Sequence, residues 1–124
     1  MTRRHALLAP LVAAALAFAG GCGGDEPAVR ARDGRMGVVL DDFRFVPQKI
    51  RANRGTLTFE LRNRGRLAHT FRLRFEGRAV VEVPSLLPGE RATKTVRLHR
   101  GNYRMFCALA NHEVLGMYGT LTVR

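Results

Sequence analysis

After residue 36, apolar and polar residues alternate along the chain in short runs, and this period of two restricts the fold more than any other feature. Leu57, Phe59 and Leu61 alternate with polar neighbours, and the run from His69 to Phe75 repeats the pattern. Such alternation is typical of strands that bury one face. Gly, Pro or Asn separates the runs about every ten residues, and no stretch after residue 36 keeps a helical period. The pattern predicts an all-β antiparallel sandwich or barrel.

The first 21 residues have the pattern of a bacterial export signal. Arg3 and Arg4 precede an Ala- and Leu-rich run over residues 6–20, which is too short for a comfortable membrane span. The run ends in A-G-G-C, which resembles a lipobox, so we expect Cys22 to carry a lipid at the start of the mature chain. Cleavage near residues 19–21 without lipidation is the alternative, and the paired arginines leave open the general or the twin-arginine export route.

Three regions follow from these patterns: a signal over residues 1–21, a tether over residues 22–35 and a folded domain over residues 36–124. The tether is expected to be flexible because it is rich in Gly, Asp and Arg and lacks an apolar period. If Cys22 carries a lipid, Cys107 remains as a lone thiol in an oxidising compartment, where a bound metal would protect it. A disulfide between the two cysteines is the alternative.

The chain is strongly basic, with a formal charge of +11 from 21 basic and 10 acidic residues. Nineteen of the 21 basic residues are Arg, and they are spread along the whole chain without a basic block or interleaved stacking aromatics. The base composition of the genome explains this spread of arginines better than a nucleic-acid interface does, so we expect no nucleic-acid partner. A basic surface does favour encounter with acidic partners.

One late segment, residues 103–123, concentrates residues that bind soft metals. Cys107, His112 and Met117 follow one another at five-residue intervals between two strand patterns. His69 lies at the end of an alternating row and points to the same face as its apolar neighbours, so it is the candidate for a second imidazole. A thiolate, two imidazoles and a weak axial thioether form the ligand set of blue-copper electron-transfer sites. Met105 precedes Cys107 on its strand and is expected to pack in the core.

Residues 36–124 resemble the cupredoxins, the type 1 blue-copper family of plastocyanin and azurin. The resemblance rests on D-F-x-F-x-P at Asp42–Pro47, on Asn63 and Gly65 before His69, and on the closing Y-x-M-x-C-x4-H-x4-M-x-G-x-L-x-V. It implies a Greek-key β-sandwich of about seven to eight strands. It also implies one type 1 copper, for which the ligands carried over are His69, Cys107, His112 and Met117.

The resemblance further implies that Thr70, the residue after the first histidine, braces the cysteine loop. In the family the late histidine reaches the surface through an apolar patch that serves as the electron port. The candidates for that patch here are Leu67, Leu87, Leu109, Val114 and Leu115.

We therefore expect a monomeric protein that carries single electrons between redox partners outside the cytoplasmic membrane. It would lie at the outer face of that membrane or in the periplasm, attached through the lipid on Cys22. The alternative is a cell-surface copper carrier that delivers the ion with the same ligands. An enzyme is not expected, because copper oxidases need H-x-H pairs for further copper sites and the sequence contains none.

Overall fold

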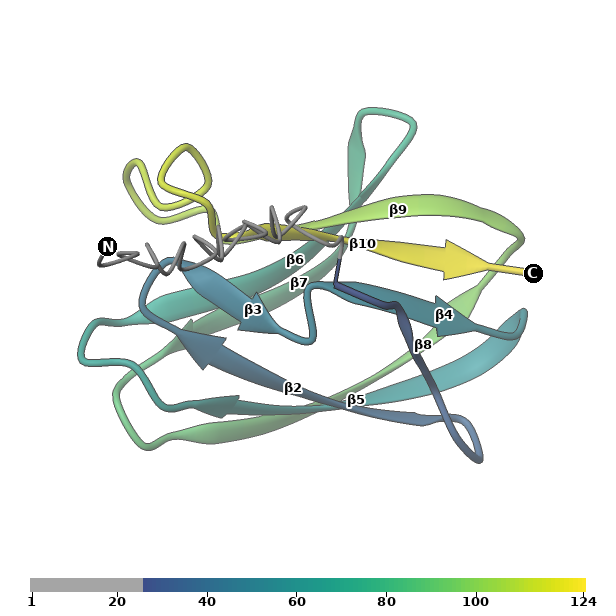
Figure 1. Cartoon of the computed structure of the whole chain (residues 1–124), viewed down its shortest axis with the longest axis horizontal. Coiled ribbons are helices and arrows are strands. Elements are labelled where there is room, and N and C mark those ends of the chain that lie inside the picture. Colours follow the sequence, from purple (N-terminus) through teal and green to yellow (C-terminus); the bar gives the residue numbers. More distant parts are fainter. Residues whose placement is uncertain (1–25) are drawn as a thin grey trace, which may run out of the picture.

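The computed structural model describes residues 26–124, which form two β-sheets around one core (Figure 1). The six-stranded sheet has the order β1-β4-β10-β9-β6-β7 and the four-stranded sheet the order β3-β2-β5-β8. The strands are β1 (Val29–Arg30), β2 (Arg35–Asp41), β3 (Arg44–Val46), β4 (Lys49–Ala52), β5 (Gly55–Asn63), β6 (His69–Phe75), β7 (Arg78–Leu86), β8 (Arg91–Leu98), β9 (Gly101–Phe106) and β10 (Tyr118–Val123). Across residues 26–124 there is no helix that is long and apolar enough to cross a membrane.

The all-β sandwich expected from the sequence is confirmed, with two differences in detail. It has ten strands rather than seven to eight, because β1 and the three-residue β3 are separate short elements. Three pairings are parallel, namely β1 with β4, β4 with β10 and β2 with β5. Alternation shows which face of a strand is buried, but it does not show the direction of the neighbouring strand.

The ordered domain begins before residue 36, which corrects the expected boundary of the flexible tether. Val29 and Arg30 pair in parallel with β4, and the backbone N–H of Ala31 donates to the carbonyl of Arg51 at 2.8 Å. These contacts join backbone atoms, so they form without the apolar period that was missing from the sequence. The expected signal and the first residues of the tether, including Cys22, lie outside the described residues.

Strand β7 includes Pro84 and continues to Leu86. Proline is tolerated here because β7 is the edge strand of its sheet. The extension places Leu86 opposite His69, the first residue of β6.

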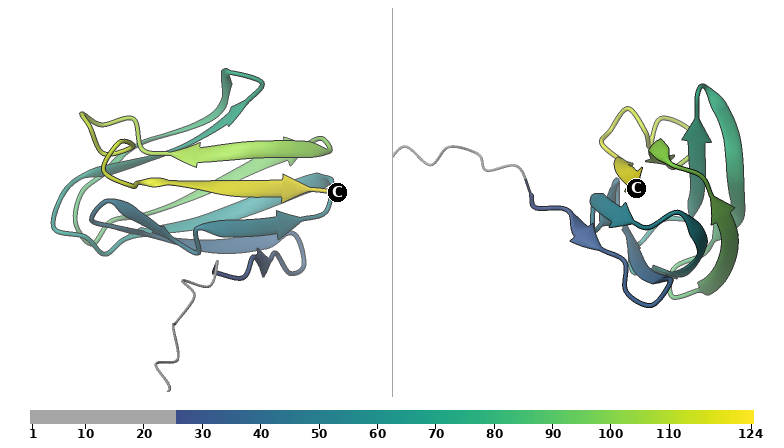
Figure 2. Two further views of the ribbon diagram at one scale, coloured as in Figure 1. Left: turned by 45° about the horizontal axis from the view of Figure 1, so that its top comes forward. Right: turned by 90° about the vertical axis from the view of Figure 1, so that its right-hand side faces the viewer.

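The core fills the space between the two curved sheets, which Figure 2 shows in its right-hand view along the strands. Phe71 of β6 packs against Phe45 and Phe59 of the other sheet, with ring centroids 5.7 and 4.9 Å apart. His69 continues the inward row of Phe71 and Leu73, as its position on the strand predicted, and all three side chains are fully buried. His69 ends this row at the start of β6, and that end of the strand lies at the left of Figure 1, where the β5–β6, β7–β8 and β9–β10 connections gather.

Candidate metal centre

The metal-binding residues come from two places on the chain that the sheet brings together. His69 opens β6, while Cys107 follows β9, His112 lies in the β9–β10 loop and Met117 precedes β10. Backbone hydrogen bonds close this loop: Met117 N–H donates to the His112 carbonyl at 2.9 Å, and Cys107 N–H donates to the Met117 carbonyl at 3.1 Å. The loop is therefore fixed at both ends by the β9–β10 ladder.

The donor atoms converge on one point. Nδ1 of His69 lies 3.2 Å from Nδ1 of His112, which lies 3.6 Å from Sγ of Cys107. All three donor atoms lie within 4.8 Å of one another. Atoms that bind one ion at about 2.0–2.3 Å are separated by up to roughly 4 Å. The separations of 3.2 and 3.6 Å between the His112 nitrogen and the other two donors therefore fit a single metal. His69 and Cys107 are buried, which keeps water from two of the donors.

Met117 joins this cluster from the core. Its side chain is fully buried, and its backbone is bonded to both Cys107 and His112. The other methionine of this region, Met105, is also fully buried, but it pairs with Leu73 and Gly119 in the middle of the sheet and packs in the core as expected.

Thr70 contacts the thiol directly. Its backbone N–H lies 3.4 Å from Sγ of Cys107, and its hydroxyl lies 3.6 Å from the same sulfur. The hydroxyl oxygen also accepts a hydrogen bond of 2.8 Å from the N–H of Ala108. Thr70 thus links β6 to the start of the ligand loop, and its two donors stabilise negative charge on the sulfur.

Asp42 contacts the first histidine ligand, a role that the sequence did not predict. Its Oδ1 lies 3.1 Å from Nε2 of His69, on the opposite side of the ring from the metal-facing Nδ1. Hydrogen bonds from the backbone N–H of Arg66 and from His69 lower the pKa of Asp42 to about 2, with a smaller contribution from Leu67. The carboxylate is therefore ionised at neutral pH. The motif around Asp42 was visible in the sequence, but its contact with His69 was not.

His112 is the partly exposed ligand, and Phe43 covers one edge of its ring. The two ring centroids are 5.0 Å apart in an edge-on arrangement. Phe43 has a φ of 60°, a left-handed conformation that is unusual for an aromatic residue and turns its ring toward the site. Burial lowers the pKa of His112 below 6.5, and His69 adds repulsion whenever its own ring is protonated. The shift favours the neutral imidazole, which is the form that binds metals.

The lowered pKa of His112 predicts an acid-sensitive fold in the metal-free protein. At pH values between the two pKa values of His112, the unfolded chain binds more protons than the folded chain. The free energy of unfolding therefore decreases as the pH falls below about 6.5. We expect a lower urea midpoint near pH 5 than near pH 7.5, and His112→Gln should reduce the difference. Asp42 contributes little in this window, because its unfolded pKa of 3.8 and its folded pKa of about 2 both lie below pH 5. Equal pH dependence in the variant and the parent would contradict the assignment to His112.

Comparisons with known proteins agree with this geometry. The family model of the cupredoxin-like domain matches residues 8–123. A search of curated proteins found no match.

Solved structures with the same fold include two from photosynthetic bacteria. Dithionite-reduced auracyanin from Roseiflexus castenholzii has a TM-score of 0.69 at 16% identity, covering 76% of this chain and 99% of that one. Auracyanin A, a "blue" copper protein from Chloroflexus aurantiacus, has a TM-score of 0.62 at 17% identity, covering 73% and 100%. Rusticyanin from Thiobacillus ferrooxidans has a TM-score of 0.65 at 17% identity, covering 78% and 82%. At 16–17% sequence identity, these structural similarities establish the fold of the chain and nothing further.

The donor set adds the chemistry, because two imidazoles, a thiolate and a thioether are the ligands that type 1 copper takes. Since the family model covers nearly the whole chain, this protein belongs to the cupredoxin family, with one copper site formed by His69, Cys107, His112 and Met117.

Proposed function

We propose that the protein is a single-electron carrier that works outside the cytoplasmic membrane through its type 1 copper. The observation that carries this proposal is the convergent set of donors, with three donor atoms within 4.8 Å of one another and two of the three residues buried. When bound, copper supplies the one-electron couple, and the protein supplies ligands that suit both oxidation states.

The chain restrains these ligands in a way that suits electron transfer. His69 belongs to a strand paired on both sides, and the ligand loop is closed by backbone hydrogen bonds at both ends. Thr70 ties the two parts together through Ala108 and Cys107. Ligands that are held in place need little rearrangement when the charge of the site changes.

An apolar surface near His112 supports a role for this end in docking to redox partners. Val114 is 88% exposed and Leu115 is 52% exposed on the loop that carries His112. Leu67 and Leu87 are exposed on neighbouring connections, whereas Leu109 is partly buried and packs against the core. Exposed apolar groups of this kind mark interaction sites. We propose that partners approach His112 across these residues, and the basic surface favours acidic partners.

The opposite end of the sandwich suits an anionic membrane surface. The β4–β5 and β8–β9 turns and the C-terminus meet at the right of Figure 1, where Arg54, Arg97 and Arg100 line one hollow. No ion pair formed within residues 26–124 includes these three arginines. We propose that the chain is exported and attached through a lipid on Cys22, so that this end faces the membrane and the copper end faces outward.

Repeated oxidation and reduction of the purified protein separates electron transfer from copper delivery. We expect the copper to be reduced and reoxidised many times without loss, even with a weak chelator present, because His69, Cys107 and Met117 are buried and the ligand loop is closed by backbone hydrogen bonds. The measurement is stopped-flow absorption during alternating reductant and oxidant, together with copper analysis after each cycle. Slow reduction combined with ready loss of copper to the chelator would favour the alternative, a carrier that delivers the ion.

A further inference from the structure

The carboxylate of Asp42 lies directly behind the first histidine ligand. Its Oδ1 is 3.1 Å from Nε2 of His69, while Nδ1 of the same ring faces His112 at 3.2 Å. His69 is fully buried, so Nε2 has no access to water and Asp42 is its partner. An ionised carboxylate can only accept hydrogen bonds, so the proton of the neutral ring lies on Nε2 and the lone pair lies on Nδ1.

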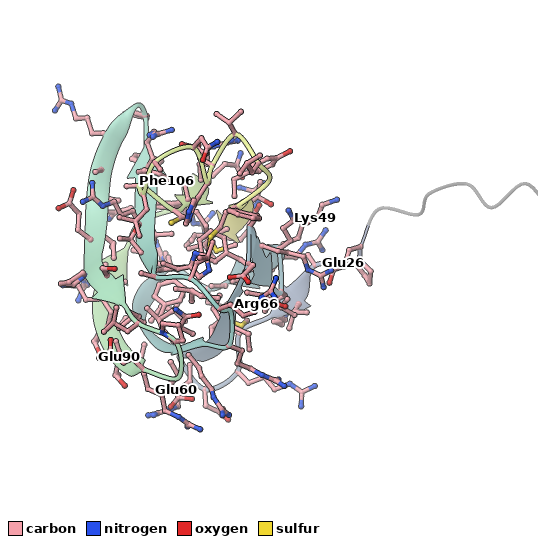
Figure 3. All side chains as sticks on the ribbon, turned by 90° about the vertical axis from the view of Figure 1, so that its left-hand side faces the viewer. Glu26, Lys49, Glu60, Arg66, Glu90 and Phe106 are labelled. Atoms are coloured by element: carbon pink, nitrogen blue, oxygen red, sulfur yellow. The ribbon has the colours of Figure 1, made fainter. Side chains whose placement is uncertain are left out.

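Asp42 is itself held by the backbone of the β5–β6 connection. Its two carboxylate oxygens accept hydrogen bonds from Arg66 N–H at 3.0 and 3.1 Å, and Oδ1 accepts another from Leu67 N–H at 3.1 Å. The guanidinium of Arg66 also approaches at 3.6 Å, but this side chain is 95% exposed and adds little. Figure 3 looks onto this end of the sandwich with Arg66 labelled. The backbone bonds therefore fix the carboxylate where His69 meets it.

Gly65 leaves the space in which the two groups meet. A Cβ at this position would lie 2.4 Å from Oδ1 of Asp42 and 2.9 Å from Nε2 of His69. Gly65 is not among the glycines with a positive φ, so its backbone does not require glycine. The reason for glycine here is the close approach to the Asp42–His69 pair. Asn63 supports the same arrangement, because its Oδ1 accepts a hydrogen bond of 2.9 Å from Gly65 N–H.

We infer that Asp42 is a positioning residue that orients His69 toward the copper and, through its negative charge, lowers the reduction potential of the site. A carboxylate bonded to the far nitrogen of a ligating imidazole fixes the ring and increases its basicity. The charge favours the more positive oxidation state, so Cu(II) gains more than Cu(I). This inference rests on the proposed copper function.

The charge is tested with Asp42→Asn, which keeps the size of the side chain and an acceptor oxygen. We expect the affinity for Cu(II) to fall by about 10- to 100-fold, the usual cost of altering such an outer partner. If the variant loses ten times more affinity for Cu(II) than for Cu(I), its reduction potential rises by about 59 mV, and each further factor of ten adds the same amount. Asp41→Asn is the matched control, because it removes the same charge one residue earlier without contact to His69.

The orientation is tested in the metal-free protein with Asp42→Ala, which removes the acceptor. Nitrogen-15 NMR of the parent should show His69 with its proton on Nε2 alone, and Asp42→Ala should show a mixture of the two tautomers. An unchanged tautomer would overturn the positioning role, and equal potentials in Asp42→Asn and Asp41→Asn would overturn the effect of charge. If the parent protein fails to bind copper as a type 1 site, the proposed function fails, while the tautomer measurement still decides whether Asp42 holds His69.

Discussion

Replacing Cys107 by Ser is expected to abolish the intense visible absorption of the copper-loaded protein. The absorption of a type 1 site depends on strong covalent coupling between copper and a thiolate, and a serine hydroxyl does not ionise to replace it. Cys107 is buried and nearly matches Ser in size, so the fold should persist. The measurement is an optical spectrum of each protein after addition of one equivalent of Cu(II).

Cys22→Ser provides the matched control, because it makes the same chemical change at the other cysteine of the chain. That variant should keep the full absorption, since residue 22 lies far along the chain from the copper ligands. A visible band that survives in Cys107→Ser would contradict the ligand assignment. A colourless parent protein with bound Cu(II) would contradict the type 1 site itself.

The sequence predicted the fold class and the ligands because both depend on side chains. On a strand the direction of a side chain follows from its position, so the inward placement of His69 could be read from the alternation with Phe71 and Leu73. The spacing of Cys107, His112 and Met117 likewise limited them to one loop between two strands. The types of the ligand residues, their spacing and the alternation of side chains along a strand were sufficient to predict this part of the site.

The features that the sequence did not predict depend on backbone atoms. Asp42 is held by the N–H groups of Arg66 and Leu67, and any residue except proline offers that donor. Strand β1 joins the sheet through its backbone in the same way. Because such bonds do not require particular side chains, neither the role of Asp42 nor the start of the domain left a pattern in the sequence.

Asn63 supports the β5–β6 connection that holds Asp42, and Asn63→Ala is expected to destabilise the fold strongly. Its side chain is fully buried and donates to the carbonyls of Leu67 and Leu86 at 2.8 Å each. Alanine would remove the donor from both carbonyls, and it would leave the N–H of Gly65 with only the longer hydrogen bond of 3.3 Å to the Leu40 carbonyl. An unsatisfied buried group costs about 1–3 kcal/mol, so we expect a total loss of about 2–4 kcal/mol after local relaxation.

That loss is a large part of the roughly 5–15 kcal/mol that stabilises a typical domain. Urea unfolding of the metal-free protein measures it, with Asn102→Ala as the control. Asn102 is exposed and accepts one hydrogen bond from Thr122 Oγ1 at 3.2 Å, so its replacement should cost less than about 0.5 kcal/mol. Similar losses in both variants would show that burial of the Asn63 amide does not stabilise the loop. A large loss confined to Asn63→Ala, accompanied by weaker Cu(II) binding, would link the stability of this loop to the position of Asp42 and His69.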